Sequence, residues 1–137
     1  MQLKPLLAGI VLALAAAVPA TLPAAAQSLS PMHNAGLTPS LVKGFRLVVG
    51  NPYRTRMVFL VQPMDPKFRV VAADAMVNAP EIALAPGSSR PVIVTFKIDP
   101  LLKERTIGVC VLPKDLDGPL LPRVCGTYTG RLLGAGG

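Results

Sequence analysis

Short runs in which apolar and polar residues alternate, separated by proline and glycine, are the feature of this sequence that most limits what it can fold into. In the stretch APGSSRPVIVTFKID, residues 85–99, a Pro-Gly turn leads into a run in which the apolar residues of one parity are Val92, Val94, Phe96 and Ile98. Ile93, Thr95, Lys97 and Asp99 occupy the other parity. A period of two is typical of a strand that is buried on one face. We therefore expect Val94 and Phe96 to be buried, and Thr95 and Lys97 to be exposed.

The rest of the chain has the same pattern. Further strands are expected at residues 45–49, 57–61, 67–73, 81–84, 107–111 and 124–132, with turn signals at Asn51-Pro52, Asp65-Pro66 and Pro86-Gly87. Residues 27–44 mix Ser, Pro, Gly and Asn with isolated apolar residues, so we expect an extended lead-in with at most one short edge strand. The 15 prolines and 12 glycines and the lack of helical periodicity after residue 26 favour an all-β fold. The sequence predicts an immunoglobulin-like antiparallel β-sandwich of about seven strands.

Residues 1–26 have the features of a secretory signal peptide. Lys4 precedes an apolar run at residues 6–18, and Ala24 and Ala26 fit the A-x-A cleavage rule. The run is too short for a bilayer, which needs about 20 apolar residues, and no second run of that length follows. We expect cleavage after Ala26, one domain over residues 27–137, no integral membrane segment, and a periplasmic or secreted location.

The two cysteines are predicted to form a disulfide. Cys110 and Cys125 lie in the exported part of the chain, where an oxidising compartment permits the bond. Both fall on the parity that points away from the core. A hairpin centred near Asp117-Gly118 pairs residues whose numbers add to about 235, which places position 110 opposite position 125. The alternative is a pair of free buried thiols.

The charge of the chain is basic, with 14 Lys and Arg residues against 7 Asp and Glu residues and a formal net charge of +7. The basic residues do not form one run, and an exported protein seldom meets nucleic acid. We expect no nucleic-acid partner and a solvated basic surface. Attraction to an anionic membrane surface or to an acidic protein is the weaker interpretation.

Residues that could carry out catalysis are few. His33 is the only histidine, and no acid or nucleophile lies near it in the sequence. The carboxylates of Asp115 and Asp117 fall at an expected turn, where they commonly support turn formation. We therefore expect a protein that is not an enzyme and that needs no cofactor.

A copper site is a sharper alternative. Met32 lies beside His33, and Met57, Met64 and Met76 could add soft ligands for Cu(I). Methionine also fills gaps in hydrophobic cores, and this interpretation is favoured because one histidine is few for such a site.

The order of these signals resembles the N-terminal immunoglobulin-like domain of periplasmic pilus (fimbrial) assembly chaperones. The resemblance rests on LSPMHNAGLTP, a strand that ends at Asn51-Pro52, FRV, APEIALAPGSSRPVIVTFKI and KERTIGVCVLP. It covers most of residues 27–137, and its most distinctive part is the apolar-x-Pro-Gly segment at residues 84–90.

The resemblance implies a chaperone that adds one of its own strands to an incomplete pilin-like subunit. The family's donor strand is the last of this domain, which matches residues 124–132. The partner-binding residues implied on this edge strand are Val124, Thr127, Tyr128, Thr129, Arg131 and Leu132. Gly126 and Gly130 stand where the family has bulky residues. Arg131 is either a basic anchor for the partner or a solvated side chain.

Two classes of function remain open at this point. One is a chaperone-like module that recognises exported polypeptides by edge-strand addition, and the other is a structural immunoglobulin-like domain of a surface or pilus assembly. The oligomeric state is not predicted.

Overall fold

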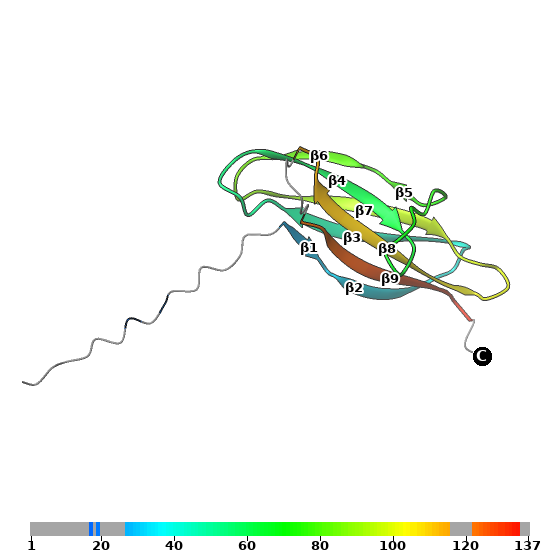
Figure 1. Ribbon diagram of the computed structural model, residues 1–137. Coiled ribbons are helices and arrows are strands. Elements are labelled where there is room, and N and C mark those ends of the chain that lie inside the picture. Colours follow the sequence, from blue (N-terminus) through cyan, green and yellow to red (C-terminus); the bar gives the residue numbers. More distant parts are fainter. Residues whose placement is uncertain (1–16, 18, 20–26, 116–121, 135–137) are drawn as a thin grey trace, which may run out of the picture.

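The structure is a computed structural model that describes residues 17, 19, 27–115 and 122–134. Regular secondary structure in these residues consists of nine strands in two sheets that pack face to face (Figure 1). The predicted signal peptide, apart from Ala17 and Pro19, and the hairpin tip at Asp117-Gly118 lie outside the described residues. Within the described part of the chain, no helix is long and apolar enough to cross a membrane.

The first sheet has four antiparallel strands in the order β1-β3-β7-β5. Their bounds are β1 Ser28–Ser30, β3 Val42–Gly50, β7 Ser89–Lys97 and β5 Met76–Val77. The second sheet has five strands in the order β2-β9-β8-β4-β6. Their bounds are β2 His33–Thr38, β9 Val124–Leu132, β8 Glu104–Pro113, β4 Met57–Met64 and β6 Glu81–Leu84. The pairing of β2 with β9 is parallel, whereas the other pairings in this sheet are antiparallel.

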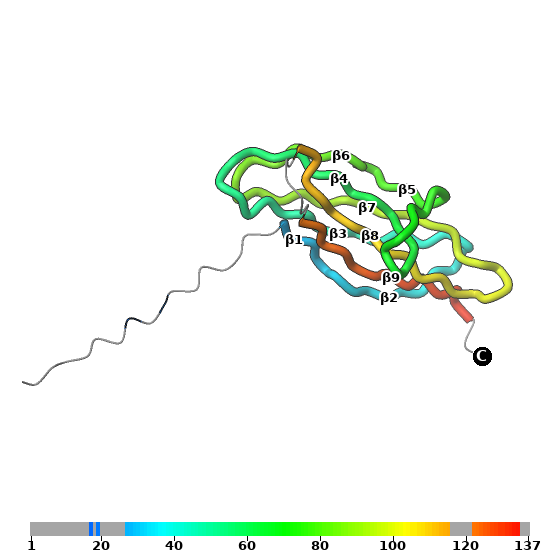
Figure 2. The backbone as a smooth tube through the Cα atoms, viewed as in Figure 1, coloured from blue at the N-terminus to red at the C-terminus, as the bar shows by residue number. Residues whose placement is uncertain are grey.

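The lead-in forms more structure than the sequence predicts. β1 pairs with β3 in the first sheet, and after Pro31 the chain crosses to the second sheet and forms β2, a path that Figure 2 shows. The expectation of at most one short strand in this segment is therefore wrong. The described residues form nine strands instead of about seven, partly because this segment contributes to both sheets.

The core lies between the sheets and is filled by alternate residues of the long strands. Val94 and Phe96 are 0% and 1% exposed, as predicted, and Lys97 is exposed. Thr95 is half-buried, so its predicted exposure is only partly right. The ring of Phe45 lies 6.0 Å from that of Phe96 and 5.7 Å from that of Tyr128, which joins the two sheets through aromatic contacts.

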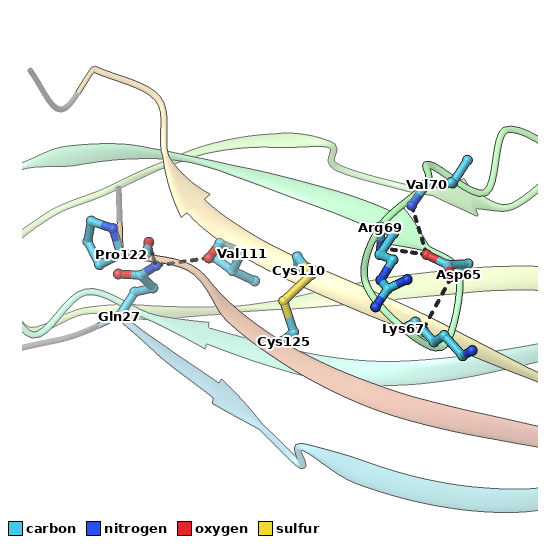
Figure 3. The surroundings of a disulfide bond; sticks show 9 residues. All are labelled: Gln27, Asp65, Lys67, Arg69, Val70, Cys110, Val111, Pro122 and Cys125. Carbon is cyan, nitrogen blue, oxygen red and sulfur yellow. Dashed lines mark hydrogen bonds between the residues drawn. A yellow bond between two sulfur atoms is a disulfide. The ribbon is translucent and has the colours of Figure 1, made fainter. Parts of the chain in front are cut away.

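The strand predicted at residues 67–73 is wrong. Only one isolated bridge, Met64 to Val71, occurs here, and residues 65–71 form a compact loop. The carboxylate of Asp65 accepts hydrogen bonds from the main-chain N–H groups of Val70, Arg69 and Lys67, at 2.8, 2.6 and 3.3 Å (Figure 3). These bonds lower the pKa of Asp65 below its usual 3.8. The carboxylate thus takes the donors that a strand would need, and the loop replaces the strand.

Candidate functional site

β9 lies inside the second sheet, so the prediction that Val124–Leu132 is an exposed edge is wrong. β8 pairs with it along one side, and β2 covers Thr127 to Leu132 along the other. The Thr127 N–H donates to the Met32 carbonyl at 2.8 Å, and the Leu133 N–H donates to the Thr38 carbonyl at 2.7 Å. The lead-in therefore already uses the main-chain groups that were expected to meet a partner.

The side chains of β9 correct the same prediction. Tyr128 is 0% exposed and belongs to the core, and its hydroxyl donates to the Pro31 carbonyl at 2.5 Å. Val124 is partly buried against the core, and Leu132 is half-buried. A Cβ at Gly126 would come within 2.4 Å of the Met32 carbonyl oxygen, so glycine is needed where the lead-in approaches. This parity of β9 faces the domain's own core and not the groove of a partner.

The other parity of β9 lies on the outer face of the second sheet. There the Thr127 hydroxyl is 2.8 Å from His33 Nδ1, and the Thr129 hydroxyl is 2.7 Å from that of Thr106. Arg131 Nε donates to Glu104 Oε2 at 3.1 Å, so this arginine already has an anionic partner. The outer face next to β2 is thus a polar surface built from paired side chains.

The open edge on this side of the sheet belongs to β2. In a parallel ladder, alternate residues of a strand bond to the same neighbour. The bonds accepted by Met32 and Thr38 place the even-numbered residues of β2 toward β9. His33, Ala35 and Leu37 therefore turn their main-chain N–H and C=O groups to the open side.

Two side chains already form hydrogen bonds with main-chain groups on this open side of β2. Asn34 Oδ1 accepts the Ala35 N–H at 2.9 Å, and Lys43 Nζ donates to the Leu37 carbonyl at 3.2 Å. Both bonds are exposed to water, so the side chains can leave at little cost. Leu37 is 56% exposed and lies with Ala35, Gly36, Thr129 and Arg131 around a shallow depression. This edge combines open main-chain groups with room for a side chain beside them.

The other outermost strands of the described sheets, β6, β1 and β5, are shorter than β2. β6 has four residues, preceded by Pro80 and followed, after one residue, by Pro86; its Glu81 pairs with Lys114 at 2.6 Å. β1 has three residues and β5 has two. Short strands, proline and charge are the usual protection of a sheet edge against strand addition. At six residues and without an internal proline, β2 is the longest of the four outermost strands in the described sheets.

The predicted disulfide is present beside this surface. Cys110 and Cys125 face each other in the β8–β9 ladder, with their Cα atoms 4.1 Å apart (Figure 3). The predicted register, in which paired numbers add to 235, holds along the whole ladder. Cys110 is on the outer parity as predicted, yet it is 0% exposed. The alternation of the sequence thus predicts correctly which face of the sheet Cys110 lies on, but it does not predict that Cys110 is buried on that face.

A second link between distant parts of the chain, a pair of hydrogen bonds donated by Gln27, lies close to the disulfide. Gln27 is 2% exposed, and its Nε2 donates to the carbonyls of Val111 and Pro122 at 2.9 and 2.5 Å (Figure 3). Gln27 thereby fixes the start of the lead-in to the end of β8 and to the approach to β9. The position of β2 is set from both ends, because β1 holds to the first sheet and Leu133 holds to Thr38.

The methionines proposed as copper ligands do not come together. Met57 and Met64 stand at opposite ends of β4, roughly 23 Å apart at 3.3 Å per residue. Met64 is buried, Met57 packs on the core, and Met76 lies in the other sheet. Among the described residues, no group of three His, Cys, Asp or Glu side chains could hold a metal ion. The arrangement favours the core-filling interpretation of Met57 and Met64.

The comparisons with known proteins bear on the fold. No protein-family model and no curated protein sequence matches this chain. Its structure is similar to the E. coli chaperone DraB, with a TM-score of 0.63, 17% sequence identity, and coverage of 80% of this chain and 56% of that one. It is equally similar to a Salmonella enterica structure of the SafA pilin with the SafB chaperone, with a TM-score of 0.63, 16% identity and the same coverage.

A third neighbour is not a bacterial chaperone. The ASH/PapD-like domain of human CEP192 matches with a TM-score of 0.59 and 14% identity, over 97% of this chain and 96% of that domain. The chain spans about half the length of the pilus chaperones that it resembles, whereas it spans nearly all of the CEP192 domain. The chain has the PapD-like immunoglobulin fold that periplasmic pilus chaperones share.

Proposed function

We propose that this protein is an exported, non-catalytic binding module that recognises pilin-like or other secreted polypeptides by strand addition at the open edge of β2. The observation that carries the proposal is the length and openness of this edge compared with the protected edges elsewhere in the sandwich. The fold shared with pilus chaperones supports the class of partner. The predicted signal peptide and the disulfide are compatible with a periplasmic location.

An added strand would bond to the main chain of His33, Ala35 and Leu37. It would displace the side chains of Asn34 and Lys43 from the edge. Main-chain bonds supply affinity in strand addition, and pockets for alternate side chains supply specificity. The depression beside Ala35 and Leu37 would take a side chain of the added strand. Such a site accepts many sequences, as a module for unfolded or incomplete chains requires.

The test compares two substitutions at Leu37. Leu37→Pro removes an N–H that faces the open side, and an outward-facing position of an edge strand tolerates proline. Leu37→Ala removes the side chain but keeps this N–H. Binding to a pilin-like subunit from the same periplasm should fall at least about tenfold for the proline variant and less for the alanine variant. Thermal melting of both variants shows that the sandwich is intact.

Proline at a second position provides the matched control. Glu81 stands on the opposite edge, so Glu81→Pro should leave binding of the subunit unchanged. Equal affinity of wild type and folded Leu37→Pro for the subunit would show that β2 is not the site.

A structural immunoglobulin-like domain is the second candidate, because nearly full coverage of the CEP192 domain shows that this fold is not confined to pilus chaperones. In this case the protein would remain in purified surface assemblies in fixed ratio to the other subunits. A chaperone would be found in the periplasm and would be absent from the mature assembly.

A further inference from the structure

Exposed apolar side chains gather at one end of the sandwich. Three segments meet there: the β2–β3 turn, the β7–β8 corner and the end of β9 (Figure 1). Hydrogen bonds fix them together, from the Ile98 N–H to the Leu41 carbonyl and from the Leu132 N–H to the Lys103 carbonyl, both at 2.8 Å. We call this surface the leucine end, and its exposed apolar members are Leu41 (44%), Val42 (45%), Leu101 (90%), Leu102 (75%) and Leu133 (59%).

Leu101 and Leu102 project furthest, and their main chain is already satisfied. Asp99 Oδ1 accepts the N–H groups of Leu101 and Leu102 at 2.8 and 3.1 Å, and the Asp99 carbonyl accepts that of Lys103 at 2.7 Å. A main-chain group that enters a membrane without a partner is costly. Because these donors are paired within the corner, the two leucine side chains can leave water without exposing unpaired N–H groups to lipid.

The charges around the corner favour an anionic surface. Lys97 and Lys103 are exposed on either side of the leucines, and neither forms an ion pair with a described residue. The nearby acids are occupied: Glu104 pairs with Arg131, and Asp74 pairs with Arg105 at 2.6 Å. The carboxylate of Asp99 accepts main-chain N–H bonds within the corner and keeps its negative charge. Because Asp74 and Glu104 are each paired with an arginine, Lys97 and Lys103 outnumber this one carboxylate, and the net charge next to the apolar tip is positive.

We propose that the leucine end binds the surface of an anionic membrane, with Leu101 and Leu102 inserted at the level of the lipid headgroups and Lys97 and Lys103 against the phosphates. Apolar insertion together with basic side chains is the combination that holds peripheral proteins on anionic lipid. A protein partner fits less well, because protein interfaces are enriched in aromatic side chains and the exposed apolar members of this end are aliphatic. The open edge of β2 runs along the side of the sandwich, so a membrane-bound molecule could still accept a strand.

Flotation with lipid vesicles provides the first test. The protein is recovered from the periplasm, and all variants carry the same N-terminus, so differences between them report the leucine end alone. Wild type should float with vesicles that contain phosphatidylglycerol and not with pure phosphatidylcholine, and added salt should weaken binding. Leu101→Ser/Leu102→Ser should weaken binding about tenfold or more, and Lys97→Gln/Lys103→Gln should remove the preference for phosphatidylglycerol.

The matched control replaces exposed apolar side chains outside the leucine end. Met76 is 72% and Ile93 is 45% exposed on the outer face of the first sheet, and neither belongs to the leucine end. Met76→Ser/Ile93→Thr should float as wild type does. Thermal melting of each variant separates weakened binding from unfolding.

A fluorescent reporter locates the inserted side chain, because the sequence contains no tryptophan. Leu102→Trp gives a single indole that should shift its emission to the blue with phosphatidylglycerol vesicles and be quenched by brominated lipid. Met76→Trp should show neither change. The proposal is wrong if wild type does not bind phosphatidylglycerol vesicles, or if the double serine variant binds them equally well. Loss of self-association in the serine variant without any vesicle binding would assign this end to a protein interface instead.

Discussion

The ring of Phe68 occupies the space above Gly108 on the outer face of the second sheet. A Cβ at position 108 would come within 2.6 Å of two ring carbons of Phe68 and within 2.7 Å of the Asp65 carbonyl oxygen. Phe68 has a φ of 58°, which is unusual for a residue with a side chain. The loop of residues 65–71 can therefore pack closely on β8, because Gly108 has no side chain. This contact lies next to the disulfide (Figure 3).

Gly108→Val should destabilise the domain by about 1–3 kcal/mol, because the new side chain must displace Phe68 or the main chain of the loop. Chemical denaturation measures this loss. Gly44→Val is the control: a Cβ there would meet its nearest neighbour, Thr95 Oγ1, at 3.7 Å, so little change is expected. Equal effects of the two substitutions would show that Phe68 does not fill the space above Gly108.

Removal of the disulfide should cost about 3 kcal/mol in the chain-entropy account, since Cys110 and Cys125 are 15 residues apart. The variant is Cys110→Ala/Cys125→Ala, because Cys110 is fully buried and serine would add an unpaired hydroxyl. Urea denaturation measures the change. Non-reduced mass spectrometry provides the independent check, and two alkylatable thiols in the native protein would contradict the bond.

Phe96→Ala should cost about 3–5 kcal/mol, since the ring is 1% exposed and stacks with Phe45. Thr95→Ala, on the opposite face of the same strand, should cost less than about 1 kcal/mol. Thermal or chemical denaturation compares the two. A larger effect at Thr95 would mean that β7 faces the other way.

The buried phenol of Tyr128 should make the folded state less stable at alkaline pH. Burial raises the pKa of its phenol from 10.0 to about 12. Because the folded pKa is the higher one, the stabilisation is complete below pH 10 and is lost as the pH rises from 10 to 12. Tyr128→Phe should lose the bond to the Pro31 carbonyl, about 1 kcal/mol, and should flatten this part of the pH profile relative to wild type. Identical slopes between pH 10 and 12 would contradict a buried phenol.

The fold could be predicted where side chains alternate strictly. The parity of residues 91–99 identified the buried residues Val94 and Phe96, and the shared parity of Cys110 and Cys125 with a common hairpin centre gave their register. These predictions need only local periodicity and the position of one turn. The strand predicted at 67–73 failed because a single carboxylate, Asp65, captured the main-chain donors of three residues.

The candidate site could not be predicted in the same way. β2 has the sequence HNAGLT, in which Asn34 and Gly36 interrupt any apolar alternation. The strand forms because Gln27, β1 and Leu133 hold its ends, and these contacts join residues far apart in the sequence. Without β2, residues 124–132 looked like the edge. The lack of a side chain at Gly126 was the sequence feature that could have indicated another main chain against β9.

Amide hydrogen exchange, resolved residue by residue, tests strand addition at β2 most directly. In the free protein the N–H groups of Asn34 and Gly36 should be protected by β9, while those of His33 and Leu37 should exchange fast. When a pilin-like subunit is added, His33 and Leu37 should become protected, since an added strand takes up these donors. Binding of the subunit that leaves the exchange of His33 and Leu37 unchanged would contradict the proposed site.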